Sequence, residues 1–165
     1  MHLIGILSLY NAGVPVTVRD YRPEEFETLW RLDQECFPPG ISYSRIELKA
    51  YMRKRGSFTL VAADANDTIS GFIVAHGGNT GHIITIDVVA GARRVGVGSL
   101  LLRAAEERLR EAGSQVVSLE TAVDNVSALS FYKRHGYSVV KTWPRYYSNG
   151  IDALVMSKEL GRIRE

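Results

Sequence analysis

The residues of this 165-residue chain that are best suited to chemistry lie in a glycine-rich turn. Residues 93–98 read Arg-Arg-Val-Gly-Val-Gly, and the run Ser-Leu-Leu-Leu follows at once over residues 99–102. Two glycines let the backbone approach a ligand closely, and a helix start offers unpaired N–H groups at its positive end. Two arginines add charge that suits bidentate phosphate contacts. The turn predicts a diphosphate-binding site; the alternative is an ordinary helix start with two solvated arginines.

Two nucleotide-binding motifs do not fit this turn. A Walker A loop needs Lys and then Ser or Thr after its last glycine, whereas Val97 follows Gly96. A dinucleotide fingerprint needs a third glycine three residues after Gly98, and Leu101 stands there. The pattern that remains is Arg-x-x-Gly-x-Gly.

A second segment with a distinctive pattern covers residues 125–137. It reads Asn-Val-Ser-Ala-Leu-Ser-Phe-Tyr-Lys-Arg-His-Gly-Tyr. Asn125 suits a helix N-cap, and Gly136 suits the left-handed position that ends a helix. Ala128 and Tyr132 share one face of this helix because they are four residues apart. Taken alone, the segment predicts an ordinary amphipathic helix with Tyr132 in the core.

Composition indicates an ordinary globular domain. The chain is 45% hydrophobic and 23% charged, and its net charge of +2 gives no argument for nucleic acid or a membrane as the main partner. One cysteine cannot form an internal disulfide, so we expect a cytoplasmic protein. The apolar residues 1–10 lack a basic start and are too few to span a bilayer. We therefore expect residues 1–15 to be an N-terminal extension or extra strand, and residues 16–165 to be one domain.

The spacing of apolar residues predicts secondary structure in the order βααβββαβαββ. Ser44 and Glu47 form a predicted capping box, and Gly113 is a predicted helix stop. The predicted strands cover residues 14–19, 57–64, 68–75, 81–89, 115–123, 137–143 and 152–158. The predicted helices cover residues 20–37, 44–56, 98–112 and 125–135. This order predicts an α/β domain with a mixed sheet and helices on both faces.

The glycine-rich turn and the second segment together resemble the two hallmark motifs of the GCN5-related N-acetyltransferase (GNAT) family. The second motif, Asn-x-x-Ala-x-x-Phe-Tyr-x-x-x-Gly-Tyr, lies about 30 residues after the first, as it does in that family. The similarity covers roughly residues 16–160. Within the family, residues 36–39, 81–88, 119–121 and 146–153 resemble segments of the protein N-terminal acetyltransferases. The chain departs from their pattern at Ile151, where glutamate is usual, and at Gly91.

The resemblance implies a single mixed, mostly antiparallel sheet of about seven strands, with acetyl-CoA bound between two splayed parallel strands. The resemblance places Arg134 near the adenosine phosphates, and a solvated side chain explains this residue equally well. No metal-ligand spacing is present, so we expect no metal. The residues that the resemblance assigns to cofactor binding are Val88, Val89, Arg93, Arg94, Val95, Gly96, Val97, Gly98, Ser99, Asn125, Tyr132 and Arg134.

The resemblance also implies roles in catalysis. Tyr132 is expected to act as general acid toward the departing sulfur, and Glu120 as a base through water. Glu120 is alternatively a solvent-facing strand residue, and His82 is either a rival base or a plain surface histidine. Direct attack by the amine is expected, because no base lies near Cys36 in the sequence and packing explains that cysteine better.

The expected substrate is the α-amine of a protein or peptide. Its pKa of roughly 8, against about 10.4 for lysine, lets a modest base suffice. The residues predicted to line the site for the first residues of the peptide are Phe37, Tyr43, Tyr146 and Tyr147. Alternatively, these side chains only pack against one another. Two other functions stay open: acetylation of a small amine or a lysine side chain, and non-catalytic binding of acyl-CoA. We expect a monomer or homodimer, with or without a partner subunit.

Overall fold

One mixed sheet carries the domain, and a computed structural model describes it over residues 9–11 and 14–161. Its strands lie in the order β1-β2-β3-β4-β5-β6-β8-β7, and every neighbouring pair is antiparallel except β5 and β6. The strands are β1 (Leu9–Asn11), β2 (Val14–Asp20), β3 (Ser57–Ala63), β4 (Ile69–His76), β5 (Thr80–Val88), β6 (Val116–Ala122), β7 (Ser138–Trp143) and β8 (Ala153–Glu159). The predicted mixed, mostly antiparallel sheet is confirmed.

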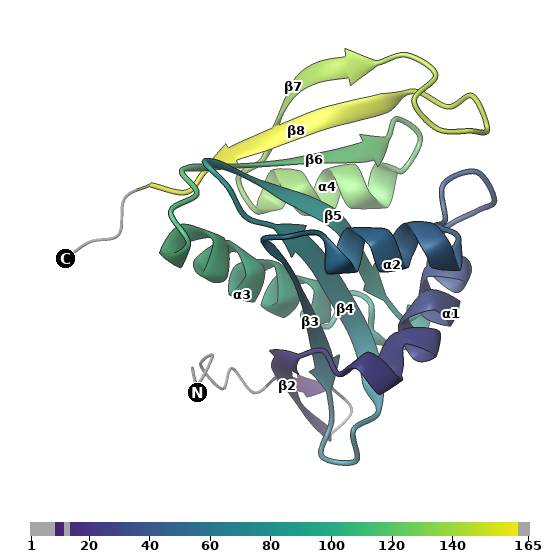
Figure 1. The fold of residues 1–165 in the computed structure, drawn as a ribbon, viewed down its shortest axis with the longest axis vertical. Helices are drawn as coiled ribbons and strands as arrows, with labels where there is room; N and C mark the ends of the chain where they lie inside the picture. Colours follow the sequence, from purple (N-terminus) through teal and green to yellow (C-terminus); the bar gives the residue numbers. More distant parts are fainter. Residues whose placement is uncertain (1–8, 12–13, 162–165) are drawn as a thin grey trace.

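Four helices cover the two faces of the sheet (Figure 1). They are α1 (Phe26–Cys36), α2 (Arg45–Arg53), α3 (Val97–Glu111) and α4 (Val126–Arg134). The capping box predicted at the start of α2 is present, since Ser44 Oγ accepts a hydrogen bond from the Glu47 amide. None of the helices in the described ranges has the length and apolar character needed to span a membrane.

Alternation along the central strands divides the core into two clusters. Leu60 and Ile73 pack on the face covered by α3 and α4, whereas Val61 and Phe72 pack on the face covered by α1 and α2. Successive side chains of a strand point to opposite faces, so a strand buried on both faces must be apolar throughout. This is why β3 and β4 read as continuous apolar runs rather than as alternating ones.

The parallel strands β5 and β6 separate soon after they meet, as Figure 1 shows. Their pairing joins Thr80–His82 to Val116–Ser118 only, although β5 continues to Val88 and β6 to Ala122. The register between β4 and β5 shifts at Ala75, so that Ile84 is skipped and β5 bends there. The predicted splayed pair is therefore confirmed, and it opens a gap in the sheet.

The predicted N-terminal extension lies partly outside the described residues. Residues 1–8 and 12–13 are not described, while Leu9–Asn11 form β1 and pair with β2. With β1 included, the described sheet has eight strands.

Candidate active site

The glycine-rich turn forms the start of α3. Gly96 is the N-cap residue with a φ of 94°, a left-handed conformation that disfavours any side chain. Within the described ranges, no oxygen accepts a hydrogen bond from the amides of residues 94–99. Six donors therefore collect at the positive end of a fifteen-residue helix. This arrangement suits a bound diphosphate.

The second motif packs directly on this turn. A Cβ built on Gly98 would lie 3.4 Å from the ring of Phe131 on α4, which is van der Waals contact, so the start of α3 lies directly against α4. Ser99 Oγ lies 2.9 Å from His135 Nε2, just after α4. Burial, followed by the charge of Arg103, lowers the pKa of His135 and keeps its ring neutral. The two motifs are thus adjacent in space.

The three predicted arginines occupy different environments. Arg93 Nε donates to the Val88 carbonyl at 3.0 Å, and its guanidinium also reaches Cys36 Sγ at 3.5 Å. Arg93 therefore links β5 to α1. It must release these contacts before its whole guanidinium can bind phosphate. Arg94 and Arg134 are exposed, Arg94 with a φ of 64°.

The backbone of Val88 and Val89 borders the gap. The Val89 amide donates to Ser70 on β4, and the Val89 carbonyl accepts from Ala92. Because residues of an antiparallel pair direct their backbone groups alternately to the two sides, the Val88 amide points away from β4. Val88 therefore offers an amide to the gap, whereas both backbone groups of Val89 are already engaged.

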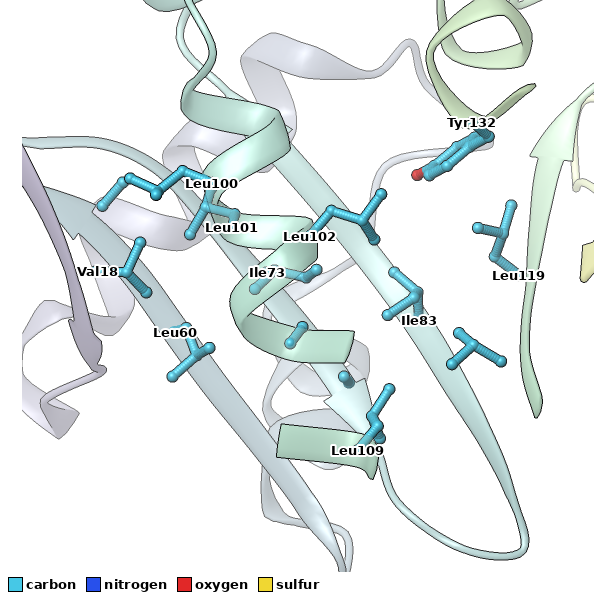
Figure 2. Packing of buried hydrophobic residues seen from close by; sticks show 14 of the residues in the cluster. Val18, Leu60, Ile73, Ile83, Leu100, Leu101, Leu102, Leu109, Leu119 and Tyr132 are labelled. Atoms are coloured by element: carbon cyan, nitrogen blue, oxygen red, sulfur yellow. The ribbon is translucent and has the colours of Figure 1, made fainter. Parts of the chain in front are cut away.

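Tyr132 lies on α4 at the core side of the gap and is 6% exposed. Its ring packs edge-on against Phe131 and Tyr137, and Figure 2 shows it extending toward the core residues of α3. Burial, followed by the nearby Asp87, raises the pKa of Tyr132, so the hydroxyl stays protonated. Asn125 caps α4, and its Oδ1 accepts from the Ala128 amide at 3.1 Å.

His82 and Glu120 meet at the apex of the gap. His82 is the last residue of β5 that pairs with β6, and Glu120 lies two residues beyond its partner Ser118. His82 Nε2 is 2.6 Å from Glu120 Oε2, and the two side chains are 34% and 23% exposed. The sequence offered these groups as rival bases, but the structure joins them in one hydrogen-bonded pair that water can reach.

Two pairs of tyrosines lie beside the strands of the gap, and the pair after β7 is close to Glu120. Tyr146 and Tyr147, in the loop after β7, pack edge-on at 5.0 Å, and the charge of Glu120 contributes to the raised pKa of each after burial. Tyr43 packs edge-on against Tyr51 at 5.2 Å, and burial raises the pKa of Tyr43. Three of the four predicted substrate walls thus lie in aromatic clusters, and sequence reasoning missed Tyr51.

Gly40 fixes the contact between the loop before α2 and the loop after β7. Its carbonyl accepts from Ser148 Oγ at 3.1 Å, and a Cβ at this position would lie 2.8 Å from Asn149 Cβ. Its φ of 90° also favours glycine. Phe37 is half-buried at the end of α1 and belongs to neither core cluster of the described residues.

Sequence reasoning also missed two buried carboxyl groups, Asp33 and Asp87. A signal was present, because Asp87 interrupts the inward-facing positions of β5 and Asp33 follows Leu29 by four residues on the buried face of α1. Cys36 packs beside them, and burial raises the pKa of its thiol, which makes it a poor nucleophile. Over the described ranges, no group of three or more potential metal ligands is found.

Comparison with known proteins places the chain in a family. Residues 26–137, more than half of the chain, match the family described as "Acetyltransferase (GNAT) family". N-alpha-acetyltransferase 30 of Schizosaccharomyces pombe is 32% identical over 144 residues, which are 84% of this chain and 94% of that protein. The chain belongs to the GNAT family and is an N-acetyltransferase.

Solved structures show the same fold. Ard1 from Thermoplasma volcanium superposes with a TM-score of 0.81 at 27% identity, covering 90% of this chain and 99% of that one. Arabidopsis thaliana Naa50, solved in complex with the bisubstrate analogue CoA-Ac-MVNAL, gives a TM-score of 0.74 at 25% identity, covering 87% and 98%. Both superpositions cover nearly the whole domain.

Proposed function

We propose that this N-acetyltransferase transfers the acetyl group of acetyl-CoA to the α-amine of a protein or peptide N-terminus, by direct attack with both substrates bound. The observation that carries the proposal is the His82–Glu120 pair at the apex of the splayed strands, with Tyr146 and Tyr147 close to Glu120. The relatives support it, since one is named an N-alpha-acetyltransferase and another binds a bisubstrate analogue that contains CoA and a peptide.

The residues around the gap fit acetyl-CoA. The amides of residues 94–99 would hold its diphosphate, and the outward Val88 amide would hold its pantetheine arm. When bound, acetyl-CoA supplies the activated acetyl group as a thioester. The Arg94 guanidinium, which is exposed beside the turn, adds charge for the phosphates. Hydrogen bonds from fixed amides need no reorganisation when the ligand arrives, which favours binding and orientation.

Two side chains would assist the reaction, one as a base and one as a hydrogen-bond donor. Glu120, hydrogen-bonded to His82 and open to water, accepts a proton from the incoming amine through a water molecule. Tyr132, protonated and packed into the core from α4, donates a hydrogen bond toward the departing sulfur. About a tenth of α-amines are uncharged at neutral pH, because their pKa is roughly 8. A water-linked carboxylate therefore suffices for an α-amine, whereas far fewer lysine amines are uncharged at the same pH.

The tyrosine loops would receive the first residues of the substrate. Tyr147 lies near Glu120 and the Tyr43 hydroxyl reaches Ile84 on β5, and both rings present large, mostly apolar surfaces. Ile151 replaces the glutamate usual in the resembling enzymes, so we propose a less polar wall there. We also propose the cytoplasm as the location. A monomer or homodimer, with or without a partner subunit, stays a prediction.

A set of peptides tests the proposal. Peptides that differ in their first two residues, each with one internal lysine, are incubated with the purified chain and acetyl-CoA, alongside versions whose N-terminus is blocked. We expect turnover on free N-termini and none on blocked ones. Equal rates on both would remove the α-amine assignment and favour lysine acetylation. Tight CoA binding with no transfer to any amine would favour a binding module.

A further inference from the structure

Two buried carboxyl groups face each other beneath the gap. Asp33 of α1 is fully buried, and Asp87 of β5 is 1% exposed. Their side chains lie within hydrogen-bonding reach of each other. In the described part of the chain, neither carboxyl forms an ion pair with a cationic side chain. Two adjacent carboxylates that lack a counter-ion cannot both ionise at little cost.

The hydrogen bonds around the pair leave room for one proton. Asp33 Oδ2 accepts from the Tyr43 amide at 2.7 Å, and Asp87 Oδ1 accepts from Thr85 Oγ1 at 2.5 Å. The other two oxygens, Asp33 Oδ1 and Asp87 Oδ2, are buried and have no donor among the described residues. A single proton between these two oxygens would satisfy both. Burial, together with the neighbouring carboxyl, raises the pKa of Asp87 well above its ordinary range.

We propose that Asp33 and Asp87 share one proton and act as a positioning pair that ties the substrate loop of Tyr43 to the cofactor strand β5. This inference rests on the proposed function. Asp33 fixes the backbone of Tyr43, whose hydroxyl also reaches the Ile84 carbonyl on β5 at 3.4 Å. Asp87 immediately precedes Val88, which offers its amide to the gap. One proton therefore links the two walls between which both substrates bind.

The surroundings of the pair define what else could titrate there. Arg93, on the turn before α3, donates to Cys36 Sγ and the Val88 carbonyl, and its charge favours ionised Asp87. The titratable and charged groups that face the pair from the packed elements are Cys36, Tyr43, Arg93 and Tyr132. The pKa values of Cys36, Tyr43 and Tyr132 are raised, so these groups stay neutral while the pair loses its proton.

Unfolding as a function of pH tests the shared proton without any substrate. In Asp87→Asn the amide donates permanently to Asp33 and still accepts from Thr85, so no proton is needed. Relative to this variant, wild type should lose stability as pH rises from about 3.9, the unfolded value, through the raised folded pKa. Inside that window the ratio of their unfolding constants should change about tenfold per pH unit. Parallel curves would overturn the proposal.

Asp33→Asn is the reciprocal variant, and it keeps the test decisive if Asp87→Asn does not fold. Its amide oxygen accepts from Tyr43 and its NH₂ donates to Asp87 Oδ2, so it too should flatten the pH dependence. Asp33→Ala removes the acceptor, and we expect the peptide KM to rise about tenfold with the acetyl-CoA KM within twofold. Asn at the same position should restore the peptide KM. Equal kinetics for the Ala and Asn variants would contradict positioning.

The two readouts separate this inference from the proposed function. Unfolding curves that differ as expected, with no acetylated peptide, would leave the shared proton in place and remove the proposed function. Acetylated peptides together with parallel unfolding curves would support the proposed function and remove the shared proton.

Discussion

The imidazole of His82 and the carboxylate of Glu120 lie 2.6 Å apart at the point where β5 and β6 stop pairing. Neither residue reaches this position through local sequence, since 38 residues separate them. The short parallel pairing brings the two strands together, and their divergence then leaves the two side chains at the apex of the gap. We propose that a substrate amine meets its base at this pair.

Replacing Glu120 tests the proposed base. Glu120→Gln keeps the size of the side chain but cannot accept a proton, so we expect kcat to fall about 100-fold. The Kd for CoA, measured by calorimetry, should stay within twofold. Glu27→Gln is the control, because Glu27 pairs with Arg45 on the exposed side of α1, and its kcat should match wild type. Wild-type kcat in Glu120→Gln would refute the assignment.

Replacing Tyr132 tests the proposed acid. Tyr132→Phe removes only the hydroxyl from a buried ring, and we expect kcat to fall at least tenfold with little change in CoA affinity. The pKa of Tyr132 is raised above its ordinary value of 10, so wild-type kcat should show no loss from this group up to that pH.

Tyr137→Phe is the matched control for that variant. It removes a hydroxyl that donates to Glu106 at 2.9 Å, so it should lower the free energy of unfolding by about 1 kcal/mol and leave kcat unchanged. If Tyr132→Phe reproduced the behaviour of this control, Tyr132 would be a packing residue only.

Substitutions of Gly96 and Gly91 test whether the turn before α3 binds the cofactor. Gly96→Ala forces a side chain into a conformation at φ 94°, at a cost of about 1 kcal/mol or more, and should displace the free amides. We expect CoA binding to weaken about tenfold by calorimetry. Gly91→Ala meets nothing within 4 Å, so its affinity should equal that of wild type. Equal affinities for the two variants would argue against diphosphate binding at this turn.

Gly40 tests the contact between the substrate loops. In Gly40→Ala the new Cβ would collide with Asn149 and push the loop after β7 away, so we expect the peptide KM to rise about tenfold. The acetyl-CoA KM should not change. Gly113→Ala, at φ 95° with nothing within 4 Å, shares the backbone strain without the collision. A similar rise in both variants would trace the effect to lost stability rather than to the loops.

The sequence predicted most of the fold because its local signals agree with one another. The Ser44 cap, the Gly96 turn and the apolar runs of β3 and β4 each set an element without reference to the rest of the chain. Long-range contacts were harder to predict. The hydrogen bond between His82 and Glu120 depends on the register of β5 with β6, which no local pattern encodes.

The contact between Asp33 and Asp87 was also beyond prediction from local sequence. Asp33 and Asp87 each violate an apolar pattern, and each violation alone has an ordinary explanation, such as a solvated edge. Only the packing of α1 on β5 makes them partners. Arg93 is a further case, because its side chain turns back to Val88 rather than toward the helix start.

The most direct test of the account is the position of the acetyl group on one peptide. A peptide with a free α-amine and an internal lysine is incubated with the purified chain and acetyl-CoA, and tandem mass spectrometry locates the modification. We predict acetyl on the α-amine, with rates that fall about 100-fold in Glu120→Gln. Acetyl on the lysine, or an unmodified peptide in the presence of bound CoA, would contradict the account.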